Sequence, residues 1–251
     1  MLNQPSQPEQ SINPDDFIIT RKRKLYKFAV FQNMANCYDD RNWPNVKEKI
    51  INSGQPLTIE VGAGTALFLT ELARQHPDRR FIAIDRKSDR LYKGAKLANE
   101  LGLTNIVYLW SNARNLASLL PNGSVSQIWL TFPDPWPQES NIKHRLSNPK
   151  FLEQYRKLLK ANGVLNFKTD NRPLFDWSAQ QFNNSQWHIT HLTHNLHSDN
   201  AVDDDAKIMT TYEERYVSEG KPINYLRAQK LIGGDRRRDY PVEISRTDKD
   251  K

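Results

Sequence analysis

The middle of this 251-residue chain alternates between short apolar segments and amphipathic segments with helical spacing. Apolar runs that alternate with helices are typical of parallel strands buried on both faces. We therefore expect an α/β fold whose sheet is mostly parallel. The expected strands are residues 57–61, 80–85, 106–110, 127–132 and 163–168, followed by strands near 187–193 and 222–229.

Several helices carry clear start and stop signals. Apolar residues recur at helical spacing after the first and second expected strands, and Gly102 is predicted to end the second of these helices. The helix after the fourth strand can be capped by Asn148, and Pro149 occupies its first position, where no N–H is needed. We expect Gly163 to end this helix, and a further helix over 172–182.

The charge balance favours a polyanionic partner. Lys and Arg number 36 against 29 Asp and Glu, which gives a formal net charge of +7. A positive field attracts phosphate-rich ligands. Basic residues gather at 21–27 and at 236–238, although each cluster could also be a solvated terminal segment.

Other features exclude several classes of protein. Cys37 is the single cysteine, so no intramolecular disulfide can form, and we expect it to be a small packed residue. No apolar run approaches the roughly 18 residues that a membrane span needs, and the N-terminus lacks the pattern of a signal peptide. We therefore expect a cytoplasmic protein that does not enter a membrane.

The residues at the strand ends indicate a nucleoside site. Ligands of open α/β sheets bind outside the carboxyl ends of the strands. Gly62 and Gly64 follow the first strand, and Asp85 closes the second. In the sequence, Asp85 follows these glycines at about the separation at which an acidic residue binds a ribose in nucleotide-binding folds. A dinucleotide is disfavoured because Leu67 replaces the third glycine and Glu60 would repel a pyrophosphate. The cationic nucleoside S-adenosylmethionine suits this pattern better.

Two more strand ends carry polar or rigid segments. Asn112 follows the third strand, and its amide could recognise the edge of an adenine. The fourth strand runs into the sequence FPDPWP, residues 132–137, whose three prolines predict a stiff loop that presents Asp134 and Trp136.

Four motifs in this order resemble the tRNA (guanine-N7-)-methyltransferase family, which acts on the guanine at position 46 of the variable loop. They are EVGAG at 60–64, FPDPWP at 132–137, Thr169-Asp170, and TxYExR from Thr210 to Arg215. The resemblance implies a Rossmann-like class I methyltransferase fold, with a mostly parallel seven-stranded sheet and helices on both faces. It also implies S-adenosylmethionine as methyl donor and tRNA as partner.

The resemblance assigns roles to individual residues. It implies Asp134 as the catalytic residue, in a cofactor site made by Glu60, Gly62, Gly64, Asp85, Asn112, Ala113 and Asp134. The implied substrate-binding residues are Gln138, Asp170, Thr210 and Glu213. Guanine N7 already carries an in-plane lone pair, so we expect Asp134, Asp170 and Glu213 to orient the base rather than deprotonate it.

Within that frame we divide the chain into four parts. Residues 1–16 are predicted to be disordered, 17–50 to form a basic N-terminal extension, 51–234 to form the methyltransferase domain, and 235–251 to form a basic C-terminal tail. The motifs are compatible with a monomer or a homodimer.

The basic run that usually follows PDPWP in this family is altered here. Gln138 and Asn141 replace a lysine and a histidine, Glu139 adds a negative charge, and Asn171 stands where a tryptophan is usual. Each lost phosphate contact weakens RNA binding. Two alternatives therefore stay open, namely a diverged paralogue that methylates another RNA or a small molecule, and a non-catalytic RNA-binding module.

A histidine repeat invites a metal hypothesis. Neither a strand nor a helix with this spacing brings four ring nitrogens together, so we predict a surface strand or loop and no metal site. The repeat consists of His188, His191, His194 and His197.

Overall fold

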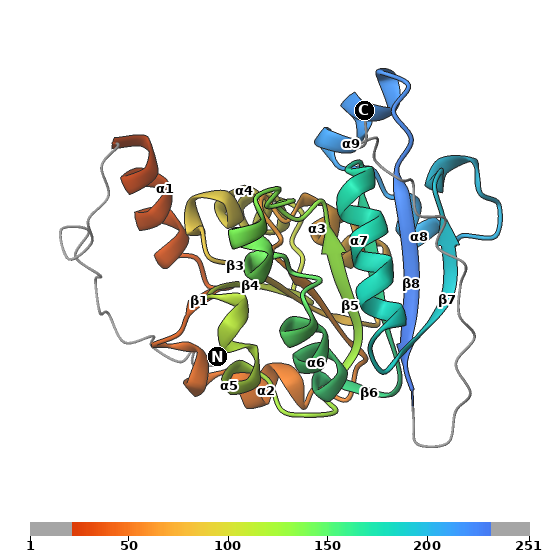
Figure 1. Cartoon of the computed structure of the whole chain (residues 1–251). Helices are drawn as coiled ribbons and strands as arrows, with labels where there is room; N and C mark the ends of the chain where they lie inside the picture. Colours follow the sequence, from red (N-terminus) through yellow and green to blue (C-terminus); the bar gives the residue numbers. More distant parts are fainter. Residues whose placement is uncertain (1–21, 232–251) are drawn as a thin grey trace, which may run out of the picture.

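The computed structural model describes residues 22–231, except for the side chains of 211 and 212, and contains one eight-stranded sheet (Figure 1). The strand order is β1-β4-β3-β2-β5-β6-β8-β7. Neighbouring strands from β1 to β6 pair in parallel, and β8 runs antiparallel to both β6 and β7. The mostly parallel α/β sheet predicted from the sequence is therefore confirmed.

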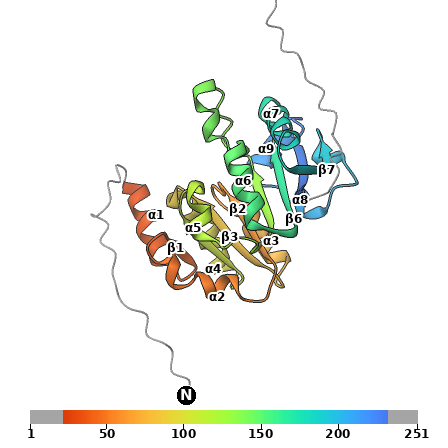
Figure 2. The same cartoon turned by 60° about the horizontal axis from the view of Figure 1, so that its bottom comes forward.

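The seven expected strands are all present, with ends shifted by a few residues. An eighth, β1, was not expected, because three residues are too short to show a pattern in the sequence; it pairs with β4 at one edge of the sheet (Figure 2). The strands are β1 (Cys37–Asp39), β2 (Leu57–Val61), β3 (Arg80–Asp85), β4 (Ile106–Trp110), β5 (Val125–Thr131), β6 (Leu159–Thr169), β7 (Trp187–Thr193) and β8 (Asn224–Lys230).

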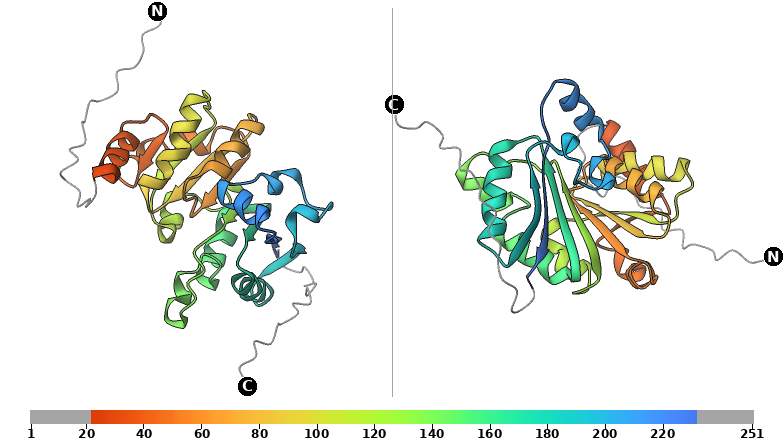
Figure 3. Two further views of the ribbon diagram at one scale, coloured as in Figure 1. Left: turned by 90° about the horizontal axis from the view of Figure 1, so that it is seen from above. Right: turned by 90° about the vertical axis from the view of Figure 1, so that its right-hand side faces the viewer.

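Helices cover both faces of the sheet (Figure 3). One buried cluster joins the sheet to α1, α3, α4 and α8, and the other joins it to α5, α6 and α7. The helices are α1 (Lys22–Gln32), α2 (Lys47–Ile51), α3 (Leu67–Gln75), α4 (Ser88–Glu100), α5 (Leu116–Leu119), α6 (Pro149–Leu158), α7 (Arg172–Asn183), α8 (Asp204–Lys207) and α9 (Thr211–Ser218). No helix within residues 22–231 is long and apolar enough to span a membrane.

The start of α6 is as predicted, and its end is not. Asn148 accepts a hydrogen bond from the backbone N–H of Lys150, and Pro149 is the first helical residue. The helix stops at Leu158, well before Gly163, because β6 already begins at the next residue. Lys230 of β8 donates to the carbonyl of Leu159 and thereby fixes this early change from helix to strand.

The N-terminal extension predicted over 17–50 is not separate from the domain where the structure describes it. Phe28 and Phe31 of α1 are buried, and α1 packs against α4. Cys37 is a packed residue of β1, as expected, and burial raises the pKa of its thiol. The predicted disordered segment 1–16, the tail 235–251, Arg21 and the basic cluster 236–238 lie outside the described residues.

We predict that Gly94→Ala destabilises the protein, although alanine is usually favoured over glycine inside a helix by about 1 kcal/mol. A Cβ at Gly94 would lie 2.8 Å from the backbone oxygen of Thr65 and 3.0 Å from the Tyr108 ring, so α4 would have to move. The expected loss is about 1–3 kcal/mol in the free energy of unfolding measured with urea. The exposed neighbour Lys93→Ala serves as the control, and a gain in stability for Gly94→Ala would contradict the prediction.

Candidate active site

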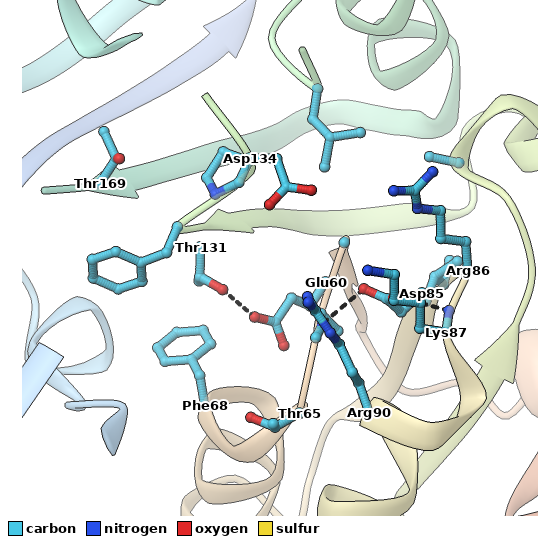
Figure 4. A pocket seen from close by; sticks show the side chains of 18 of the residues that line it. Glu60, Thr65, Phe68, Asp85, Arg86, Lys87, Arg90, Thr131, Asp134 and Thr169 are labelled. Carbon is cyan, nitrogen blue, oxygen red and sulfur yellow. Dashed lines mark hydrogen bonds between the residues drawn. The ribbon is translucent and has the colours of Figure 1, made fainter. Parts of the chain in front are cut away.

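A cavity of about 670 Å³ lies at the carboxyl ends of the parallel strands (Figure 4). Its walls come from the loops after β2, β3, β4, β5 and β6, together with parts of α9. Most of the residues singled out in the sequence meet there: Glu60, Gly62, Gly64, Asp85, Asn112, Ala113, Asp134, Asp170 and Thr210. Gln138 and Glu213 do not line it.

The glycine loop after β2 makes a tight turn at the floor of this pocket. Gly62 has a φ of 75°, and a Cβ there would lie 2.7 Å from Cδ1 of Leu146. The backbone N–H groups of Gly62 and Ala63 both donate to the carbonyl of Ile84 in β3. A side chain at position 62 would therefore strain the backbone and require the side chain of Leu146 to shift.

Asp85 is held in one orientation by the backbone around it. Its carboxylate accepts hydrogen bonds from the N–H of Gly64 at 2.9 Å and from the N–H of Lys87 at 2.8 Å. Burial raises the pKa of Asp85, and these two bonds oppose the shift. A carboxylate has about four lone-pair positions, so this group can still accept from a pair of ligand hydroxyls.

Glu60 is a buried acid with one unpartnered oxygen. Oε1 accepts a hydrogen bond from the Thr131 hydroxyl, whereas Oε2 has no hydrogen-bond partner. Burial raises the pKa of Glu60 from its usual 4.5 to about 8, against the opposing effect of Lys168. A ligand cation favours the ionised form of this buried carboxyl, whose orphan oxygen can accept from it. The site therefore fits the ammonium and sulfonium of S-adenosylmethionine.

The loop that carries Asp134 is held in an unusual backbone conformation. Phe132 and Trp136 both adopt positive φ, 46° and 43°, which residues other than glycine rarely do. Arg145 supports the loop by donating to the carbonyls of Pro135 and Trp136, at 2.9 and 3.2 Å. Asp134 is exposed at the mouth of the pocket, above Glu60 and Thr131 (Figure 4).

A fully buried lysine ties the far wall of the pocket to the sheet. Nζ of Lys168, near the end of β6, donates to Glu213 at 2.8 Å and to the carbonyls of Ala206 and Ile208 at 3.1 and 2.8 Å. It also lies 4.5 Å from the centre of the Phe68 ring. Burial lowers the pKa of Lys168, and Glu213 opposes this shift.

Glu213 does not line the pocket, because its side chain is fully buried in the protein, and its predicted contact with the substrate stays a prediction. Besides Lys168, its carboxylate bonds the ring of His197 at 2.9 Å and the backbone N–H of Thr210, whose hydroxyl in turn accepts from the N–H of Glu213. This reciprocal capping box starts α9. Glu213 therefore positions Thr210 and Tyr216, which line the pocket. The Thr-x-x-Glu spacing could have revealed this role.

The altered residues 138–141 lie outside the pocket, whereas Asn171 lines it. Gln138 is exposed and accepts a hydrogen bond from Asn141 at 2.9 Å, so its predicted role in substrate binding stays a prediction. Asn171, in place of the usual tryptophan, caps α7 by accepting from the N–H of Leu174 at 2.8 Å.

The histidine repeat is divided among separate partners. His191 bonds Asp199, His194 bonds Asn224, and His197 bonds Glu213. Within the described part of the chain, no group of His, Cys, Asp and Glu could hold a metal ion.

Several pocket residues were missed in the sequence. For Arg86, Lys87 and Arg114 the available signal was their position just after a strand end, since Arg86 follows Asp85 and Arg114 follows Asn112 by two residues. The others lie within helices and carried no such signal. The missed lining residues include Phe68, Arg86, Lys87, Arg90, Arg114, His144 and Tyr216.

The known proteins that this sequence resembles are methyltransferases. A sequence model of a family described as "Putative methyltransferase" matches residues 54–226. A protein of Cytophaga hutchinsonii named tRNA (guanine-N(7)-)-methyltransferase is 37% identical over 217 residues, which are 84% of this chain and 98% of that protein. A protein of the same name from Mesomycoplasma hyopneumoniae is 35% identical over 75% of this chain and 97% of its own length.

Solved structures support the fold. The 16S rRNA methyltransferase KamB has a TM-score of 0.57 at 18% identity, over 74% of this chain and 92% of that one. A 16S rRNA (adenine(1408)-N(1))-methyltransferase of Catenulisporales acidiphilia, solved with the cosubstrate SAM, has a TM-score of 0.53 at 16% identity, over 77% and 93%. The expected class I methyltransferase fold is confirmed, with the additional strand β1.

We predict that Glu60→Gln flattens the pH dependence of stability. Between pH 4.5 and 8 the folded protein keeps the Glu60 proton that the unfolded chain releases, so the free energy of unfolding falls as pH rises. Glutamine removes this contribution, which amounts to a few kcal/mol at most. Urea unfolding at pH 5, 6.5 and 8 measures it, with the exposed Glu48→Gln as control. Equal pH profiles for Glu60→Gln and wild type would contradict the pKa of about 8.

We predict that Lys168→Met lowers the free energy of unfolding by about 3–5 kcal/mol, because it leaves the Glu213 charge buried without its cation. The double variant Lys168→Met/Glu213→Gln is expected to recover part of this loss, since glutamine keeps the capping box and removes the charge. Urea unfolding of the two single variants and the double variant gives the coupling energy. Simple additivity of the two single effects would rule out the ion pair as the stabilising link.

Proposed function

This chain belongs to the family of tRNA (guanine-N(7)-)-methyltransferases, and from this membership we propose that it transfers a methyl group from S-adenosylmethionine to N7 of a guanine in tRNA. Position 46 of the variable loop, in the cytoplasm, is the target that the sequence motifs favour. The observation that carries the proposal is the buried Glu60 carboxylate with its unpartnered oxygen, beside the oriented Asp85.

The cofactor supplies an electrophilic methyl group when it is bound. Glu60 balances its positive charge, and Asp85 accepts hydrogen bonds from its ribose hydroxyls. Asn112 and Ala113, which line the same pocket after β4, border the adenine. The glycine turn at 62–64 lets the backbone approach without a side chain in the way.

The guanine needs placement rather than activation. Its N7 lone pair is already available, so the rate depends on holding N7 in line with the methyl group and away from water. The base has to leave its stack to reach the pocket. Asp134 and Asp170 line the pocket. In this proposal their carboxylates accept from the guanine N1–H and amino groups. Thr210, fixed by Glu213, completes this wall.

We predict that unmodified tRNA incubated with the protein and S-adenosylmethionine acquires 7-methylguanosine, detected by nucleoside mass spectrometry of the digested RNA. Asp134→Asn is expected to lower kcat/KM for tRNA by about 10- to 100-fold, because it weakens a hydrogen bond to a charged acceptor. Asp78→Asn, an exposed change away from the pocket, serves as control.

Two results would contradict this proposal in different ways. Full turnover by Asp134→Asn would contradict the proposal that this carboxylate orients the guanine. Absence of 7-methylguanosine despite S-adenosylmethionine binding would show that the altered residues 138–141 accompany a different substrate, and other RNAs would then be screened by the same assay.

A further inference from the structure

The arginines beside the pocket differ from most other arginines of the described chain in what they contact. Away from the pocket, Arg80 and Arg145 donate to backbone carbonyls and Arg23 has no ion pair with a described carboxylate. The others form ion pairs with carboxylates; these are Arg41, Arg74, Arg79, Arg156, Arg172, Arg215 and Arg227. Arg86, Arg90 and Arg114 line the pocket, are exposed, and form no ion pair with a carboxylate of residues 22–231. Exposed cations without carboxylate partners are free to bind an external anion.

These three arginines form one border of the pocket, which we call the cationic rim. Arg86 follows β3, and Arg90 lies in the first turn of α4; Figure 4 shows the Arg90 side chain reaching toward Asp85. Arg114 follows β4, the strand next to β3 in the sheet. Its Nη2 lies 2.9 Å from Nδ1 of His144, so the rim reaches the segment after PDPWP.

A pair of aromatic rings joins the rim to the basic helix α1. Trp110, at the end of β4, donates from its indole N–H to the backbone carbonyl of Arg86 at 3.1 Å. The ring of Phe28 in α1 meets the Trp110 ring edge-on, with 5.3 Å between centroids. This contact fixes α1 beside the rim. The preceding turns of α1 carry four exposed cations, Lys22, Arg23, Lys24 and Lys27.

We propose that the cationic rim and the basic turns of α1 form a binding surface for RNA phosphates next to the target guanine. This inference rests on the proposed function, since it places the tRNA backbone on the α1 and α4 side of the pocket while the base enters between Asp134 and Asp170. Phosphate contacts fix register and orientation without reading sequence. The rim therefore provides cations where residues 138–141 no longer do.

The test compares three double variants of the full-length protein. Arg86→Gln/Arg114→Gln removes two rim charges, and Lys24→Gln/Lys27→Gln removes two charges of α1. Arg74→Gln/Arg156→Gln removes the same net charge from arginines that are paired with carboxylates and lie outside the pocket. Fluorescence anisotropy with an unmodified tRNA transcript gives the Kd over a range of salt concentrations, and calorimetry gives the Kd for S-adenosylmethionine.

Both rim and α1 variants are expected to weaken tRNA binding about 10-fold near 0.1 M salt and to reduce the salt slope by about 1 to 2. The α1 variant is expected to keep its affinity for S-adenosylmethionine and its kcat at saturating tRNA within twofold of wild type, because Lys24 and Lys27 do not line the pocket. If the salt slopes of the rim and α1 variants match that of the control while wild type binds tRNA, these cations belong to a solvated face. The inference about the phosphate-binding surface then fails, and the proposed function is unaffected. If wild type binds S-adenosylmethionine but no tRNA, the proposed substrate fails together with this inference.

Discussion

The buried ammonium of Lys168 is the interaction on which the arrangement of the pocket depends. Removing a lysine from water is costly unless its donors are all satisfied, and here a carboxylate and two carbonyls satisfy them. The segment around α8 and α9 has little regular structure to hold it against the sheet. One cation in β6 therefore fixes the wall that carries Thr210, and it does so from a position that never touches the pocket solvent.

The same charge influences Glu60, because Lys168 opposes the effect of burial on the pKa of that acid. With a pKa of about 8, Glu60 holds its proton at neutral pH until a cation arrives. Binding of a cationic cofactor favours the ionised form and expels the proton. In the proposed cofactor site, affinity is therefore coupled to pH, and the coupling arises from burial at a strand end rather than from any catalytic base.

Much of the fold could be predicted because apolar strands and a capped helix such as α6 are local patterns. The pocket residues could be predicted because parallel strands bring their carboxyl ends to one edge. Strand β1 and the early end of α6 could not, since pairing with β4 and the contact from Lys230 are long-range. The burial of Glu213 could not be predicted, because its partner Lys168 lies 45 residues away in the sequence. Spacing reveals the capping box but not the buried cation.

The conformation of the Asp134 loop has a consequence for the order of events in recognition. Phe132 and Trp136 hold backbone conformations that cost energy, and Arg145 with three prolines keeps them there before any ligand binds. The conformational entropy of this loop is thus lost during folding, so binding of a ligand does not have to order the loop again. The loop is thus formed before RNA binds, and the rearrangement that capture requires is that of the target guanine, which has to unstack and turn outward.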